Sequence, residues 1–201
     1  MYVQQILTIL VLIALNGLFA AAEIAIVSAR RTALEAAADK GSSRAKGALQ
    51  ILDSPNRSLS TLSIAITLVG FGASSIAAAT FEKPLGDLFR ASGVAWLSPI
   101  ASGLAVLVVT VGVAYVTSVF GELAPKRLGL QRSASVAQAV ATPVRWLTTF
   151  LWPVVWVLDR STDLVAGIFG VRPDGRRPDV SEEEIQLLVQ QQGTLQEEEK
   201  R

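Results

Sequence analysis

The sequence predicts an all-α membrane protein with three transmembrane helices. Its composition is the first indication: 51% of the 201 residues are hydrophobic and only 17% are charged, whereas soluble domains usually carry about 25% charged residues. The second is the distribution of apolar residues, which gather in blocks of about 20, the helix length that crosses a bilayer. The third is a set of polar stripes that follow helical spacing within these blocks.

The first apolar block predicts a helix over residues 2–28. It stays apolar up to Val27 and ends before a pair of arginines. A cleaved signal peptide is the alternative, because the alanine triplet at 20–22 resembles a cleavage site. However, the residues ahead of the apolar core include no Lys or Arg, which a signal peptide normally has. We therefore interpret the block as a spanning helix.

A polar linker over residues 29–57 follows. Its Ala, Glu, Arg and Lys content favours one or two helices, with a break near Gly41. The next two blocks, 58–80 and 98–122, carry no charge across their apolar centres and predict two further spanning helices. Together these segments form a predicted transmembrane core over residues 1–133.

Lysine and arginine counts predict the orientation of the helices. The loop between the second and third blocks has two basic residues, Lys83 and Arg90, and three more follow the third block. The first linker holds six: Arg30, Arg31, Lys40, Arg44, Lys46 and Arg57. The positive-inside rule therefore places this linker and the C-terminus in the cytoplasm, and the N-terminus outside.

Residues 134–170 are apolar but interrupted by prolines and charged residues. A charge in the middle of a span costs about 3 kcal/mol, and tryptophan favours headgroup depth. We therefore predict a juxtamembrane belt of amphipathic or re-entrant helices on the cytoplasmic side, with a fourth span as the alternative. In residues 171–201, Ser181 and Glu184 form a capping box and predict an acidic, cytosolic connector helix.

Two polar stripes run along the first and second helices. Asn16 and Glu23 lie seven residues apart and share one face; a carboxylate near membrane depth usually faces a cavity and has a functional partner. The alternative is that Glu23 extends to the cytoplasmic interface. The second helix has small and hydroxylic residues at spacings of three and four, which indicate either a hydroxyl-lined pathway or tight helix packing: Ser60, Ser63, Thr67, Gly70 and Ser74.

The end of the third helix predicts an oxygen cluster. Pro125 has no N–H group, so the carbonyl of Gly121 loses its helical partner, next to the carboxylate of Glu122 and beside Ser118. Broken helices of this kind coordinate ions in transporters. The alternative is an ordinary proline-terminated helix in which Glu122 pairs with Lys126 four residues later.

The residue types present narrow the possible chemistry. Cysteine and histidine are both absent, so a metal site must use oxygen ligands, which suit hard cations such as Mg²⁺. Without Cys or His the usual nucleophilic pairs are missing, and we do not expect an enzyme. Basic runs interleaved with aromatic residues are also missing, so nucleic-acid binding has little support.

Three segments resemble one family. Residues 16–25 (NGLFAAAEIA) resemble the first-helix signature N-x-x-F-S-A-A-E of the CorC/CNNM transmembrane domain, and residues 64–70 (IAITLVG) resemble its second-helix segment. Residues 121–126 (GELAPK) resemble its G-E-[LI]-x-P-K motif. The resemblance covers nearly the whole chain, although Ala20 replaces the usual serine and Ser63 stands where glutamine is frequent.

The resemblance implies a homodimer in the inner membrane of a bacterium. Members of this family are called magnesium and cobalt efflux proteins or hemolysin-like proteins, and they carry a cytosolic CBS-domain pair that binds ATP. The resemblance also implies Mg²⁺ as the transported ion and Na⁺ as the coupling ion. Residues 171–201 would then lead into a CBS pair that this sequence does not contain.

Residues and resemblance together predict a Mg²⁺ site. Glu122 would neutralise part of the charge, with neutral oxygens from Asn16, Ser63, Thr67 and the carbonyls of Gly70 and Gly121. Glu23 and Ser118 would line the cytosolic entrance, and Pro125 and Lys126 would mark the helix break. A membrane anchor or sensor for a cytosolic regulatory module, without transport, is the alternative function.

Overall fold

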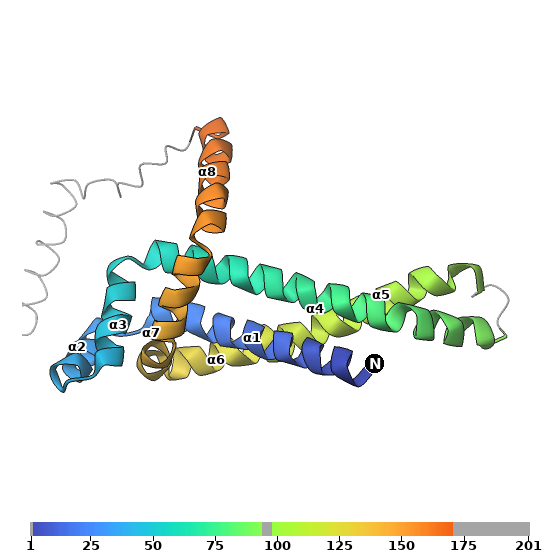
Figure 1. Ribbon diagram of the computed structural model, residues 1–201, viewed down its shortest axis with the longest axis horizontal. Coiled ribbons are helices and arrows are strands. Elements are labelled where there is room, and N and C mark those ends of the chain that lie inside the picture. The colour runs from blue at the N-terminus through green and yellow to red at the C-terminus, as the bar shows by residue number, and fades with distance from the viewer. Residues whose placement is uncertain (1, 94–97, 171–201) are drawn as a thin grey trace, which may run out of the picture. The chain divides into compact units, whose positions relative to one another are not determined.

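The structure is a computed structural model that describes residues 2–93 and 98–170, and within those ranges every regular element is helical. Three helical segments are long and apolar enough to cross a membrane, which confirms the predicted all-α class with three candidate spans. They are α1 (Tyr2–Ser28), α4 (Pro55–Ala91), and a third segment from Ser98 to Gln131. Figure 1 shows α1, α4 and α5 running side by side.

The third segment is made of four consecutive helical pieces. A short 3₁₀ turn, η1 (Ser98–Ile100), leads into α5 (Ala101–Ser118), a π-helical turn, η2 (Val119–Leu123), and α6 (Ala124–Gln131). In the π turn the N–H of Ala124 donates to the carbonyl of Val119, five residues earlier. Such single π turns are rare and frequently lie at functional sites.

Three helix bounds differ from the predicted ones, and the first is the start of the second helix, which lies at Pro55 rather than at residue 58. The second helix runs to Ala91 rather than to residue 80, and it continues through Pro84 and Gly86. In its last turns Arg90 pairs with Asp87 at 2.8 Å, a contact that helical spacing allows. The third helix continues to Gln131, so the expected break at Pro125 is wrong. A π turn precedes Pro125, which lies in the first turn of α6, where a helix tolerates proline.

The polar linker folds as the sequence predicts. It forms α2 (Arg31–Asp39) and α3 (Ser43–Asp53), separated at Gly41, whose φ of 90° is a left-handed conformation that favours glycine. The hydroxyl of Ser42 caps α3 by accepting a 3.2 Å hydrogen bond from the N–H of Ala45.

Residues 134–170 fall into α7 (Ser133–Phe150) and α8 (Trp152–Ile168). Neither is among the helices long and apolar enough to span. On α8, Trp152 and Trp156 are both exposed. The predicted connector over residues 171–201 lies outside the described residues.

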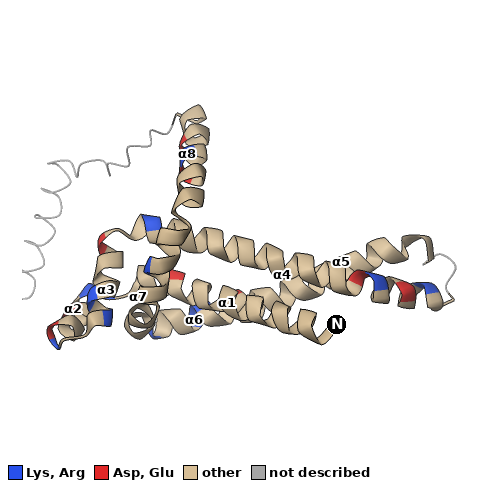
Figure 2. Cartoon of the chain, in the orientation of Figure 1, with Lys and Arg blue, Asp and Glu red and all other residues tan. Residues whose placement is uncertain are grey.

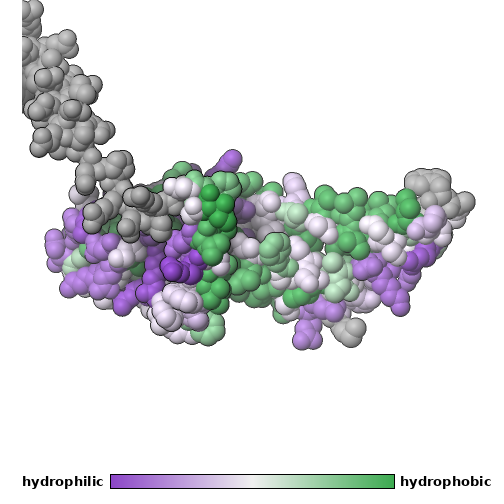
Figure 3. All heavy atoms as spheres, turned by 90° about the horizontal axis from the view of Figure 1, so that it is seen from above, coloured by the Kyte–Doolittle hydropathy of each residue, from purple (hydrophilic) through white to green (hydrophobic). Residues whose placement is uncertain are grey.

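Two apolar clusters hold the core of the described helices. One joins α1, α2, α3, α4 and α7 around the fully buried Leu34 and Leu62. The other lies between α1, α4 and α5 and consists of Ile9, Ile13, Ala77 and Val109. Charged residues gather around α2 and α3 and toward the far end of α4 (Figure 2), while apolar surface covers the middle of the helices (Figure 3).

Candidate functional site

The first and third spanning segments meet at the π turn. The side-chain amide of Asn16, which is 2% exposed, donates a buried 2.9 Å hydrogen bond from Nδ2 to the carbonyl of Gly121. This is the carbonyl that the proline four residues later leaves without a helical donor. The sequence predicts that Pro125 frees this carbonyl, and in the structure α1 supplies a donor for it.

Glycines allow this close approach of α1 to η2 and α6. A Cβ on Gly121 would lie 3.3 Å from both Asn16 Nδ2 and the carbonyl oxygen of Ile13. A Cβ on Gly17 would lie 2.9 Å from Cγ of Pro125, and one on Gly129 only 2.5 Å from the carbonyl oxygen of Ala21. Larger side chains at these positions would push the helices apart.

A cavity of about 260 Å³ opens beside this contact. Two of its lining residues hold oxygens that are buried without a hydrogen-bond donor among the described residues: Asn16 Oδ1 and Thr117 Oγ1. Because Asn16 Nδ2 is bound to a carbonyl, Oδ1 faces away from it, toward Gly70 of α4. The cavity is lined by Asn16, Ile66, Thr67, Gly70, Phe71, Ser74, Ala114, Thr117, Ser118 and Glu122.

Charged side chains form a bridge at the edge of the cavity. Lys126 Nζ lies 2.9 Å from Glu122 Oε1 and 3.4 Å from Glu23 Oε2. The hydroxyl of Ser63 donates to Glu23 Oε1 at 3.1 Å. The i,i+4 pair of Glu122 and Lys126, considered above as an alternative to an ion site, therefore exists, and Lys126 also joins the carboxylates of two different helices.

The structure thus separates the predicted ligands into two groups. Asn16, Thr67, Gly70 and Glu122 all line the cavity, together with Ser118, which was predicted at the entrance. Ser63 does not line it but belongs with Glu23, and Thr67 Oγ1 donates to the carbonyl of Ser63 at 2.9 Å. Thr117 was not predicted as a ligand, although its place on one face with Gly121 was visible in the sequence.

Within the described ranges, no three carboxylates come together into a group that could hold a metal. A cation in the cavity would therefore meet one carboxylate, from Glu122, and several neutral oxygens. Such a site binds by hydroxyl, amide and carbonyl dipoles with little fixed charge, which suits binding followed by release.

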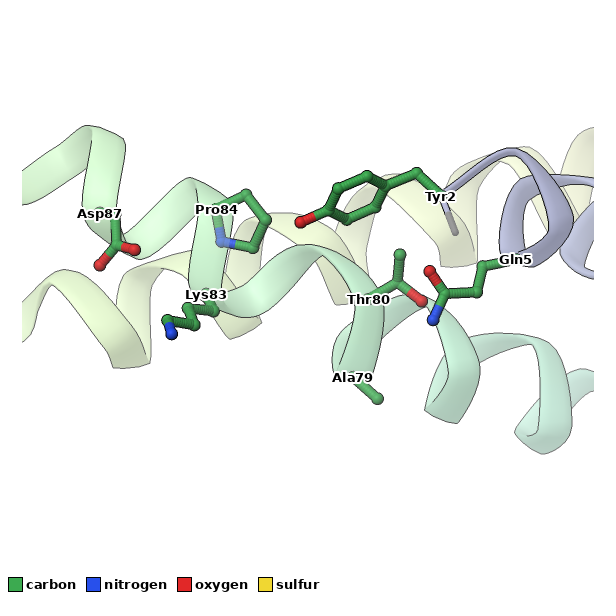
Figure 4. A pocket seen from close by; sticks show the side chains of 7 residues that line it. All are labelled: Tyr2, Gln5, Ala79, Thr80, Lys83, Pro84 and Asp87. Atoms are coloured by element: carbon green, nitrogen blue, oxygen red, sulfur yellow. The ribbon is translucent and has the colours of Figure 1, made fainter.

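A second cavity, of about 330 Å³, lies at the opposite end of α1 and was not predicted. Figure 4 shows Gln5 of α1 beside Thr80 of α4 and the ring of Tyr2 directed toward Pro84. Lys83 and Asp87 of α4 also line the cavity. The Oε1 atom of Gln5 is buried without a donor among the described residues. Two features of the sequence could have indicated this cavity. One is Pro84 inside α4, which frees the carbonyl of Thr80, and the other is the i,i+4 spacing of Lys83 and Asp87.

An apolar layer separates the two cavities. It is the cluster of Ile9, Ile13, Ala77 and Val109, each at most 9% exposed. A polar path along α1 would therefore be interrupted between Asn16 and Gln5, because hydrated ions do not cross a closed apolar constriction.

Comparison with known proteins gives consistent matches. The family described as cyclin M transmembrane N-terminal domain (CNNM) matches residues 7–199. A UPF0053 protein of Synechocystis is 35% identical over 187 residues, which cover 93% of this chain and 41% of the relative. The UPF0053 protein YhdT of Bacillus subtilis is 32% identical and covers 93% of this chain and 40% of the relative.

A more distant relative has a functional name. The polyamine export protein of Haemophilus influenzae is 27% identical over 176 residues, covering 86% of this chain and 40% of the relative. The chain thus spans about two-fifths of the length of the curated relatives it matches.

Proposed function

Because the chain belongs to the CNNM transmembrane family, we propose that it forms the membrane-embedded cation pathway of a transporter. The cavity beside Asn16 and Glu122 is the proposed binding site, Mg²⁺ is the proposed transported ion, and Na⁺ is the proposed coupling ion. Transport of the ion out of the cell against its gradient would draw on the Na⁺ gradient.

One observation carries the proposal: two residues that line the cavity hold buried oxygens without a hydrogen-bond partner among the described residues. Leaving a buried polar group unsatisfied costs about 1–3 kcal/mol. Asn16 Oδ1 and Thr117 Oγ1 both carry this cost, and the carboxylate of Glu122 lines the same cavity. A cation bound at these lining residues would give the two neutral oxygens a partner, whereas a purely structural helix contact leaves them unexplained.

The ligand types fit a hard cation that must also be released. Mg²⁺ takes near-octahedral oxygen ligands and keeps several waters, and the cavity of about 260 Å³ leaves room for water beside the ion. Glu122, Asn16 and Thr117 are the proposed direct ligands, with Thr67 and the backbone at Gly70 and Gly121 in support. Ser63, which the sequence predicted as a ligand, is instead proposed to act at the entrance, where its hydroxyl orients Glu23.

The alternative of a membrane anchor or sensor shares the same helices. It accounts for the close packing of small residues on α1 and α6. It gives no reason for two unsatisfied oxygens beside a carboxylate, so we favour transport. In both cases we propose a homodimer in a bacterial inner membrane. We place the N-terminus outside and α2, α3 and the C-terminus in the cytoplasm, and we propose that residues 171–201 connect to a CBS pair.

A second candidate substrate is a polyamine. Relatives from Haemophilus influenzae and Escherichia coli are named polyamine export proteins. In this chain a primary ammonium, that of Lys126, already lies within 3.4 Å of the carboxylates of both Glu122 and Glu23. The ammonium of a diamine could take the same place, because its charge and hydrogen-bond donors are those of lysine.

Isothermal titration distinguishes these proposals. Mg²⁺ and putrescine are each titrated into the purified chain in detergent, with and without Na⁺, for the wild type and for Glu122→Gln. Saturable Mg²⁺ binding that the substitution removes and that Na⁺ weakens supports Mg²⁺ and Na⁺ at one site. Putrescine binding that depends on Glu122, without Mg²⁺ binding, transfers the proposal to polyamines.

The same titration can reject transport through this cavity. The control is Glu82→Gln, which removes one carboxylate of α4 that does not line the cavity. If folded wild-type protein binds neither ligand, or if both substitutions weaken binding equally, the anchor is the better explanation.

A further inference from the structure

A third cavity, of about 210 Å³, lies where α3 ends, α4 begins and α7 passes by. Arg57 and Ser58 of α4 line one wall, and Arg145 and Thr149 of α7 line another, with Ser54 at the turn that precedes α4. The cavity is distinct from the proposed cation site, and neither the family resemblance nor the relatives' names account for it.

The charge of this cavity is positive and uncompensated. No acidic residue lines it, and neither Arg57 nor Arg145 forms an ion pair within residues 2–93 and 98–170. Asp53, next to the cavity in sequence, pairs instead with Arg31, with 2.9 Å between Oδ1 and Nη1. Two guanidinium groups beside hydroxyls match the planar, multiple-donor recognition of a phosphate group.

A hydroxyl group lies beside the two arginines. Ser58 is a residue only 7% exposed that lines the cavity, and its side chain makes no hydrogen bond with the described residues. Its hydroxyl is therefore available to donate to a phosphate oxygen in the cavity.

Neighbouring side chains place the cavity at the level of lipid headgroups. On α7, Trp146 and Phe150 stack with parallel rings 5.6 Å apart, yet they are 69% and 66% exposed. Exposed stacked aromatics in a protein with spanning helices favour the membrane interface. On α4, Arg57 precedes by two residues the apolar run that begins at Leu59, which is where a span meets the headgroups.

We infer that this cavity binds the phosphate headgroup of an anionic phospholipid. The two arginines, which come from helices far apart in the sequence, hold the phosphate, and the acyl chains run along the exposed aromatic face of α7. Basic pockets beside spanning helices bind anionic headgroups in this way. The bound lipid thereby fastens α7 to the junction of α3 and α4, and this inference does not depend on the transported ion.

The test compares phosphatidylglycerol with phosphatidylcholine on the purified chain. Native mass spectrometry counts retained lipids, and thermal unfolding in mixed micelles measures stabilisation. Both lipids carry a phosphodiester, but the choline ammonium of phosphatidylcholine is repelled by the two arginines. We therefore expect the wild type to retain phosphatidylglycerol about tenfold more strongly than phosphatidylcholine. The double variant Arg57→Gln/Arg145→Gln should lose this preference, and Arg145→Gln alone should reduce it.

The matched control is Lys40→Gln/Arg44→Gln, which removes the same charge from residues outside the cavity; it should keep the preference. An equal loss in both double variants would overturn the inference in favour of nonspecific charge attraction. Equal stabilisation by glycerol 3-phosphate would also overturn it, because the site would then bind free phosphate compounds. The wild-type comparison alone refutes it if the two lipids are retained equally, even if a variant does not fold.

Discussion

The side-chain amide of Asn16 binds the backbone carbonyl of Gly121 at 2.9 Å, across 105 residues of sequence. This bond does two things at once. Nδ2 replaces the donor that Pro125 cannot supply, and Oδ1 is left buried without a donor beside the cavity. The contact that closes the helix defect therefore also creates the acceptor proposed to bind a cation.

We expect Asn16→Ala to destabilise the protein even without any ligand. The substitution leaves the carbonyl of Gly121 buried without a donor, at a cost of about 1–3 kcal/mol. For a chain of this size each kcal/mol lowers Tm by roughly 2–4 °C. Thermal unfolding in detergent measures the effect. Ser74→Ala, at the same cavity but without a side-chain hydrogen bond, should leave Tm unchanged; an equal drop in both variants would contradict the role of Asn16.

Helical content and span number followed from local patterns in the sequence. Block length, the charges that flank the blocks and the Gly41 break depend on neighbouring residues, so they predict α1 to α4 well. Gly121 could be singled out in the same way, because proline acts on a residue four positions earlier.

The pairing of side chains between helices could not be predicted in this way. The sequence places Asn16, Ser63 and Glu122 on polar faces, but it does not say how far each helix is shifted along its neighbours. That shift depends on close contacts such as the one between Gly129 and Ala21. This shift decides that Ser63 meets Glu23 rather than the cavity.

We expect Lys126→Met to strengthen cation binding. Lys126 acts as an internal counter-ion 2.9 Å from Glu122, so an external cation must compete with it. The two side chains are 33% and 42% exposed, and ion pairs this exposed contribute about 0.2–1 kcal/mol. The expected gain in affinity is therefore about 1.4- to fivefold, measured by titration of Mg²⁺ and of putrescine.

The control for this substitution is Arg127→Gln, which removes a neighbouring charge that forms no ion pair with the described residues. It should change affinity little. Weaker binding by Lys126→Met would show that the lysine positions Glu122 for the ion instead of competing with it.

We expect Ile13→Ser to make the domain leaky. Ile13 belongs to the apolar layer between the cavities at Asn16 and Gln5 and is 7% exposed. A hydroxyl there favours water in a constriction that otherwise excludes it. Mg²⁺ flux into liposomes without a Na⁺ gradient should rise above that of the wild type. Ile6→Ser, at an exposed position (42%) on the same helix, should not raise flux, and a similar leak in both would contradict a gating role.

The last prediction concerns the contact that sets the position of α6 against α1. A Cβ on Gly129 would lie 2.5 Å from the carbonyl oxygen of Ala21 and 3.1 Å from its Cα, and backbone atoms cannot rotate away as a flexible side chain can. Gly129→Ala should therefore cost about 1–3 kcal/mol in overpacking, more than the roughly 1 kcal/mol that alanine gains in helix propensity. Gly112→Ala is the matched control, because nothing lies within 4 Å of its Cβ position. It should keep or raise Tm while Gly129→Ala lowers it.

The shift of α6 in Gly129→Ala should also move Lys126 and weaken Mg²⁺ binding, whereas Gly112→Ala should leave binding unchanged. Unchanged Tm and unchanged binding in Gly129→Ala would show that this contact does not hold the two helices together.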